Sequence, residues 1–218
     1  MEKDRFTENG LKFFGTISAS ISHEIKNRMA VINEQAGLLK DLVTLAEKGK
    51  ELSLERLMRL SESLKKQVSL TDSIVRNMNR FAHSVDSFQT STDICDLLTL
   101  TAALAKRTVD NRGVEIELEL PKPSFSLETA PFFLTNLIWQ CLEAVMNLDS
   151  KPQKLVIGCE KSENGGRIWF ITDALAVPTE EILPDSAKQL ADAIQAVVTV
   201  DSKKKMIRIE LPEYLPNK

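Results

Sequence analysis

A histidine, a carboxylate and an amide lie within five residues of one another near the start of the chain: His23, Glu24 and Asn27. Ile21 and Ile25 each lie two positions from His23. At about 100° per residue, a helix would point the imidazole about 160° away from both isoleucines, and so toward solvent. Asn27 would follow one turn later on the same face, with Glu24 adjacent. Histidine titrates closest to neutral pH and can act as a nucleophile, although on spacing alone a solvated polar face explains these residues at least as well.

Two long helices are expected to position these side chains. Residues 11–47 contain no proline, a break follows at Lys48-Gly49-Lys50, and Ser53 is placed to cap a second helix. Mostly apolar residues recur every three or four positions in both segments: Ile17, Ile21, Ile25, Met29, Ile32, Ala36, Leu39 and Val43, then Leu57, Leu60, Leu64, Gln67, Thr71, Ile74, Met78, Phe81 and Val85, with Val68, Leu70 and Val75 beside them. The pattern predicts an antiparallel hairpin. Its wide stripes favour a four-helix bundle of two chains, and the alternative is a monomer whose hairpin packs on its own second half.

The second part of the chain has a different pattern. Helices are expected over residues 93–110, 130–147 and 184–198, and strands over 114–120, 154–160, 167–173 and 206–211. Mixed helices and strands in this order predict an α/β sandwich. We therefore expect a helical hairpin over residues 1–90 and an α/β domain over residues 91–218.

Composition narrows the function classes. The formal net charge is −3, with 28 basic and 31 acidic residues interspersed, so a nucleic acid is not an expected partner. The first residues lack an apolar targeting core and no stretch approaches a membrane span, so a soluble, cytoplasmic protein is expected. Cys95, Cys141 and Cys159 are expected to be reduced core residues. His83 has no ligand-spaced neighbours and is expected to have a surface or packing role.

Two segments of the first half resemble a known family. Ser22-His-Glu-Ile-Lys-Asn-Arg-Met29 resembles the phosphoacceptor box of sensor histidine kinases, above all the His-Glu-x-Lys-Asn-Pro form of nitrogen-regulation-type kinases, and residues 67–82 resemble the second helix of the same dimerisation and phosphotransfer domain. The resemblance implies that Glu24 orients the ring of His23 or takes its proton, and that Asn27 positions water for phosphatase action. Arg28 stands where the family usually has proline, so the first helix is expected to be straighter.

The second half resembles the family's catalytic and ATP-binding domain, but with its nucleotide site degraded. Asn136 to Ala144 has the place of the box whose second asparagine holds magnesium, and that position is Gln140. Asp173 has the place of the aspartate in the Asp-x-Gly-x-Gly turn, whose glycines are replaced by Leu175 and Val177. The short passage from residue 173 to 184 leaves no room for an ATP lid. The resemblance thus implies a degenerate kinase-like domain with no intrinsic cofactor or metal.

The favoured hypothesis is a histidine phosphotransferase of a two-component phosphorelay. It would be a homodimer that passes a phosphoryl group between the aspartates of response-regulator receiver domains through His23, with magnesium supplied by the partner receiver domain. The first alternative is a scaffold or regulator that binds a kinase or response regulator and never carries phosphate. An active kinase with an unusual nucleotide site is the least favoured, because several phosphate-handling features are missing.

Overall fold

The structure, a computed structural model, describes residues 2–148, 152–174 and 182–215 of the 218-residue chain. The chain folds into two compact units: Thr16–Arg80 forms one, and Met1–Gly15 together with Phe81–Lys218 forms the other. We call them the hairpin unit and the sandwich unit.

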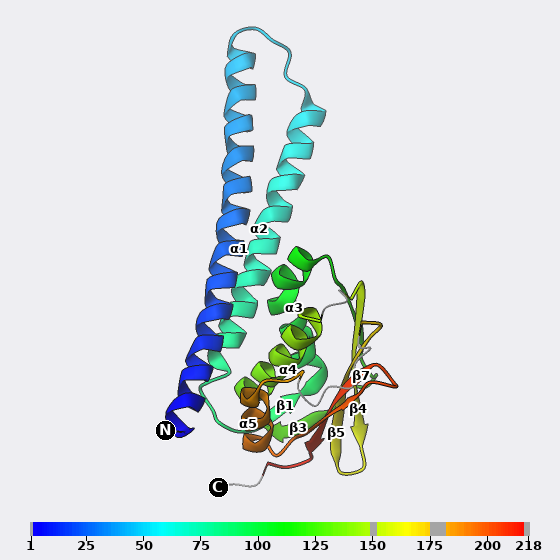
Figure 1. The fold of residues 1–218 in the computed structure, drawn as a ribbon. Helices are drawn as coiled ribbons and strands as arrows, with labels where there is room; N and C mark the ends of the chain where they lie inside the picture. The colour runs from blue at the N-terminus through cyan, green and yellow to red at the C-terminus, as the bar shows by residue number, and fades with distance from the viewer. Residues whose placement is uncertain (1, 149–151, 175–181, 216–218) are drawn as a thin grey trace. The chain divides into compact units, whose positions relative to one another are not determined.

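Two helices, α1 (Glu2–Glu47) and α2 (Leu54–His83), supply the hairpin unit and run antiparallel to each other (Figure 1). Gly49 has a positive φ of 80° in the connection, and the backbone N–H of Arg56 donates to Ser53 Oγ at 3.3 Å. The predicted break and cap are therefore confirmed. Polar bonds join the two helices: Arg28 Nη1 donates to Gln67 Oε1, and Gln35 Nε2 donates to Ser63 Oγ.

Much of the predicted apolar stripe is exposed to solvent in the single chain. Ile17 and Ile21 are buried, but further along the hairpin several members of the two stripes and their neighbours are exposed: Met29, Leu39, Val43, Val68, Leu70, Val75 and Met78. A two-helix hairpin is too thin to cover stripes of this width.

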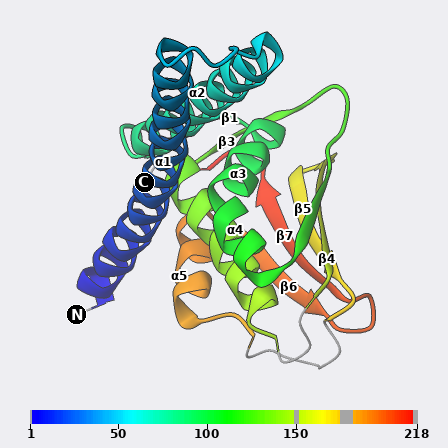
Figure 2. The same ribbon diagram turned by 90° about the horizontal axis from the view of Figure 1, so that it is seen from above.

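The sandwich unit places three helices on one face of a mixed sheet (Figure 2). The strands are β2 (Glu115–Glu119), β4 (Lys154–Ser162), β5 (Gly165–Thr172), β6 (Val197–Asp201) and β7 (Met206–Pro212), in the order β2-β4-β5-β7-β6. Among these described strands only β2 and β4 pair in parallel, as Glu117 opposite Val156 illustrates. The helices are α3 (Ile94–Arg112), α4 (Pro131–Met146) and α5 (Asp185–Ala193). The predicted combination of a helical hairpin with an α/β sandwich is confirmed.

Alternating side chains of the central strands form the core beneath these helices. Leu155, Ile157 and Cys159 of β4, Ile168 and Phe170 of β5, and Ile207, Ile209 and Leu211 of β7 are buried. α4 is apolar around most of its surface and lies at the centre of this packing, which fixes the position of its polar residues Asn136 and Gln140.

An aromatic cluster packs the first part of α1 and the end of α2 into the sandwich unit. The ring of Phe13 lies 5.5 Å from Phe81, 5.6 Å from Phe132 and 6.0 Å from Trp139. Phe13, Phe81 and Trp139 are buried, so this cluster fixes the first part of α1 and the end of α2 against α4.

Four elements differ from the sequence prediction. The helix expected over residues 184–198 ends at Ala193, and Val197 and Val198 belong to edge strand β6. Gln195 has a positive φ of 52° between them, and the β-branched run Val197-Val198-Thr199-Val200 favours a strand over a helix. A two-stranded sheet of β1 (Thr90–Asp93) and β3 (Ser126–Thr129) was not predicted.

Candidate functional site

His23 lies on α1 with its side chain exposed, and Asn27 is exposed one turn further along. Glu24 between them is half-buried, with 23% of its side chain exposed. The helical arithmetic therefore placed His23 and Asn27 correctly on the solvent face. An exposed imidazole next to a half-buried carboxylate can offer one ring nitrogen to an electrophile while the other N–H meets an acceptor.

Arg28 connects this group of residues to α2, which the sequence did not indicate. Its Nη2 lies 3.8 Å from Glu24 Oε1, and its Nη1 donates to Gln67 Oε1 at 3.3 Å. The guanidinium thus bridges the carboxylate beside His23 and an amide of the second helix, an arrangement that its planar fork allows. The spacing of Glu24 and Arg28, four residues apart on a helix, is the sequence signal for the first contact.

His83 lies at the end of α2, in the part of that helix that belongs to the sandwich unit. It is exposed, and its Nδ1 lies 2.7 Å from Asp86 Oδ2. This local contact three residues along the chain agrees with the predicted surface role.

The polar residues of α4 that correspond to the nucleotide-binding box of the kinases are hydrogen-bonded within this chain. On α4, Gln140 Nε2 donates to Asn136 Oδ1 at 3.1 Å, and Ser186 Oγ of α5 donates to Gln140 Oε1 at 2.9 Å. Both ends of the Gln140 amide are therefore engaged, including the oxygen that a magnesium ion would need. Asn136 is buried, and within the described residues its Nδ2 has no hydrogen-bond acceptor.

Asp173 is exposed just after the end of β5, and its backbone carbonyl accepts a hydrogen bond from Lys205 Nζ at 3.1 Å. Its carboxylate does not join the bonds around Gln140, which link α4 to α5. The predicted effects of Leu175 and Val177, and the predicted absence of a lid, fall on residues outside the described part of the chain.

Comparison with known proteins finds similarity in solved structures. The Acinetobacter baumannii histidine kinase AdeS matches with a TM-score of 0.51 and 12% identity over 88% of this chain and 98% of that one. The ATP-binding domain of PrrB from Mycobacterium tuberculosis matches with a TM-score of 0.50 and 18% identity, over 60% and 100% of the two chains. The catalytic domain of the histidine kinase ThkA matches with a TM-score of 0.51 and 9% identity, over 59% and 99%. The chain has the histidine-kinase fold. No family model and no curated protein matches the sequence.

Within this fold the three cysteines are buried, as predicted. Cys95 Sγ lies 3.7 Å from Cys159 Sγ, a proximity that their separation of 64 positions did not suggest. Burial raises the pKa of the Cys141 thiol to about 12, and burial together with the contact to Cys95 raises the pKa of Cys159. Such thiols are poor nucleophiles and poor metal ligands at neutral pH. Across the described residues, no cluster of three histidine, cysteine or acidic side chains is arranged to hold a metal ion.

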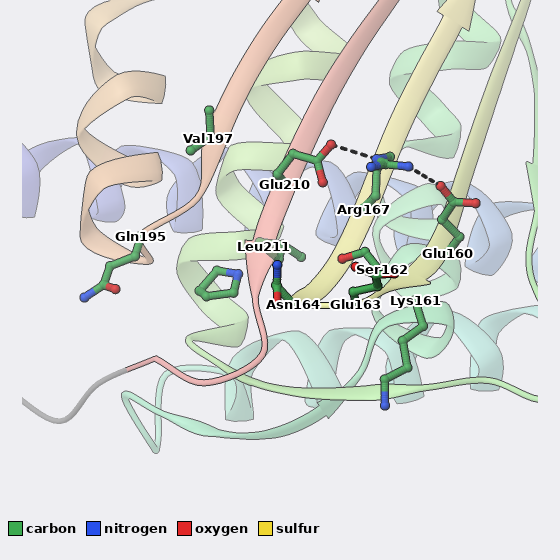
Figure 3. A pocket seen from close by; sticks show the side chains of 11 residues that line it. Glu160, Lys161, Ser162, Glu163, Asn164, Arg167, Gln195, Val197, Glu210 and Leu211 are labelled. Carbon is green, nitrogen blue, oxygen red and sulfur yellow. Dashed lines mark hydrogen bonds and ion pairs between the residues drawn. The ribbon is translucent and has the colours of Figure 1, made fainter.

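An open hollow of about 670 Å³ is lined by the end of the β4-β5 hairpin, the adjoining end of β7 and the start of β6 (Figure 3). Arg167 is its central charge, and Glu210 and Glu160 both bind its guanidinium. Hydrogen bonds to Glu210 and Glu160 raise the pKa of Arg167, so the guanidinium stays charged and paired with two carboxylates. The Arg167 guanidinium is thus already paired, and His23 remains the stronger candidate for a functional site. In the part of the chain that is described, no helix has the length and apolarity that crossing a membrane requires.

Proposed function

We propose that the chain is a histidine phosphotransferase, which accepts a phosphoryl group at His23 from the aspartate of one receiver domain and passes it to another. The observation that carries the proposal is the exposed imidazole of His23 beside Glu24 and Asn27 on a helix of a histidine-kinase fold.

The proposed transfer needs only groups that this chain and its partner supply. The lone pair of one imidazole nitrogen forms a bond to phosphorus while the bond from phosphorus to the aspartate oxygen breaks, and the aspartate leaves with that electron pair. The proton on the other ring nitrogen is held or accepted by Glu24. Passing the phosphoryl group to a second aspartate is the reverse of this step.

We propose that the sandwich unit does not bind a nucleotide. The Gln140 amide is engaged by Asn136 and Ser186, which supports a role without ATP for this unit. We propose that the chain has no intrinsic cofactor, that the receiver domain brings magnesium with its aspartate, and that the sandwich unit offers a docking surface. The exposed apolar stripes of α1 and α2 support a homodimer joined through the hairpins.

The direct test uses receiver domains that carry a labelled aspartyl phosphate. Label should move to the wild-type chain and to His83→Ala, and it should not move to His23→Ala. Several receivers are needed, since partners differ in affinity. If no receiver labels His23 while one or more binds the chain tightly, the chain is a scaffold and the transfer proposal is wrong. Labelling of His23 by Mg-ATP alone would instead identify a kinase.

A further inference from the structure

The carboxylate beside His23 is engaged by a residue other than His23. Glu24 Oε1 lies 3.8 Å from Arg28 Nη2, and no hydrogen bond joins Glu24 to His23 in the part of the chain that the structure describes. Helix geometry favours the pairing with Arg28, because a residue four positions ahead lies alongside Glu24, whereas the neighbouring His23 is rotated by about 100°. To meet the imidazole, the Glu24 side chain would have to turn away from Arg28.

Arg28 is itself held from the second helix. Its Nη1 donates to Gln67 Oε1 at 3.3 Å, and its Nε is buried and has no acceptor among the described residues. Only 32% of the Arg28 side chain is exposed, so the guanidinium is confined between the two helices. A confined guanidinium keeps its direction, and here that direction is toward Glu24.

A carboxylate that pairs with a guanidinium is a weaker acceptor for a second donor. Imidazole is activated when its non-reacting N–H donates to a carboxylate, because the hydrogen bond fixes the tautomer and raises the electron density of the ring. Glu24 cannot serve both partners fully. The position of its carboxylate therefore affects how readily His23 attacks phosphorus.

We propose that Arg28, anchored by Gln67, is a positioning residue that competes with His23 for the carboxylate of Glu24 and thereby restrains phosphorylation of His23. This inference rests on the proposed function in one respect, that His23 is the phosphoryl acceptor. Contacts that draw Arg28 away from Glu24 release the carboxylate, so Arg28 couples the reactivity of α1 to the neighbouring turn of α2.

The effect of Arg28 on the rate of His23 phosphorylation can be measured with phosphoramidate, a small phosphoryl donor that replaces the receiver domain. In the reaction an imidazole nitrogen forms a bond to phosphorus, the bond from phosphorus to the amine breaks, and ammonia leaves. Arg28→Ala should phosphorylate about two- to fivefold faster than wild type, which corresponds to about 0.4–1 kcal/mol at 1.36 kcal/mol per tenfold change in rate. Gln67→Ala, which touches neither His23 nor Glu24, should give a smaller increase. Arg28→Lys, which keeps the charge but loses the fork that reaches both Glu24 and Gln67, should resemble Gln67→Ala.

Two controls separate positioning from a general effect on the helix. Arg76→Ala removes an ion pair of the same spacing with Asp72 on α2 and should leave the rate unchanged. In a Glu24→Gln background the effect of Arg28→Ala should vanish, because the contested carboxylate is gone. Nitrogen-15 spectra of His23 should show a shift toward a single ring tautomer in Arg28→Ala.

The outcomes distinguish this proposal from the relay itself. Unchanged rate and unchanged tautomers in Arg28→Ala overturn the role of Arg28, even if receivers transfer label to His23. An equal effect of Arg28→Ala with and without Glu24 overturns it as well. The expected pattern with phosphoramidate, together with no transfer from any receiver, supports the role of Arg28 and counts against the phosphorelay.

Discussion

The imidazole of His23 is exposed on α1, so the proposed reaction with a receiver's aspartyl phosphate would need no change in the hairpin. Asn27 lies about 40° around the helix from His23, one turn further along, where its amide can contact the far side of a phosphoryl group or a water molecule. In the proposed transfer the two residues would therefore have separable tasks, attack for the imidazole and orientation for the amide.

Substitution of the amide tests this separation. Asn27→Ala should accept label from a receiver at close to the wild-type rate, because the nucleophile is untouched. The lifetime of the phosphohistidine should change, because the amide is placed to orient the attacking water and does not supply the nucleophile. Quench-flow labelling followed by decay of the isolated phosphoprotein measures both. Loss of acceptance in a folded Asn27→Ala variant would contradict the assignment.

The exposure of His23 and Asn27 followed from helical periodicity, but the bridge through Arg28 did not. Periodicity fixes the direction of a side chain around its own helix. The contact of Arg28 with Gln67 depends on which turn of α2 lies opposite α1, and that register is set by the whole hairpin. The proximity of Cys95 to Cys159 was missed for the same reason, because it depends on how α3 packs on β4.

At the scale of elements, a hydrogen bond from Ser186 of α5 engages the side-chain oxygen of Gln140 on α4, the residue at the position where the resemblance to kinases expects a magnesium ligand. We expect no measurable binding of Mg-ATP by calorimetry, since Asn136 and Ser186 already engage both ends of the Gln140 amide and glutamine replaces the shorter asparagine that the resemblance assigns to magnesium. Gln140→Asn, which restores the kinase residue, should not restore binding on its own, because Leu175 and Val177 remain. A micromolar dissociation constant for the wild-type chain would favour a kinase.

Asp93 caps α3 and gives a prediction about stability. Its side chain accepts a hydrogen bond from the backbone N–H of Asp96 at 2.9 Å, and the bonds from Ser124 and Asp96 lower the pKa of its carboxyl group below the ordinary value for aspartate. Asp93→Ala should lower the free energy of unfolding by about 0.5–2 kcal/mol at pH 7, measured by urea titration.

The pH dependence of that loss follows from the direction of the shift. A carboxyl group whose pKa is lower in the folded state stabilises the protein above its unfolded pKa, and this contribution is lost as the pH falls through the folded pKa. The difference between wild type and Asp93→Ala should therefore shrink below about pH 4. Asp93→Asn, which keeps a capping oxygen without the charge, should lose less stability at pH 7 and show little of this pH dependence.

The sequence predicted helices and strands correctly where one pattern, such as a cap residue at each end, was unambiguous. The prediction was wrong where the same spacing of apolar residues fits both a helix and a strand. The helix α3 was placed well because Asp93 and Gly113 mark its two ends, and Gly113 adopts a φ of 69° that ends a helix. The region after α5 has an apolar spacing that a helix and a strand share, and pairing with β7 decided in favour of β6. The strands β1 and β3 have four residues each, too few for a period to show.

For the whole molecule, the exposed stripes of the hairpin are the largest feature that the single chain leaves unexplained. Val68 is 56% exposed and Met29 is 52% exposed, and both belong to faces that the sequence pattern marks as apolar. The sandwich unit buries its own core beneath α3, α4 and α5, so this exposure is a property of the hairpin. Pairing with a second hairpin would cover such faces.

We predict a homodimer, with twice the 24.4 kDa of one chain by light scattering at micromolar concentration. Burying a leucine side chain contributes about 1.5–3 kcal/mol, and an unpaired charge in its place costs more, so Leu64→Asp or Ile74→Asp should split or unfold the dimer. Glu62→Lys is the matched control, because residue 62 lies on the opposite side of α2 from the stripe and is exposed. It should leave the mass unchanged. A wild-type mass of one chain would contradict the prediction, and so would an intact dimer in both stripe variants, since a charge inside a four-helix core has no acceptable place there.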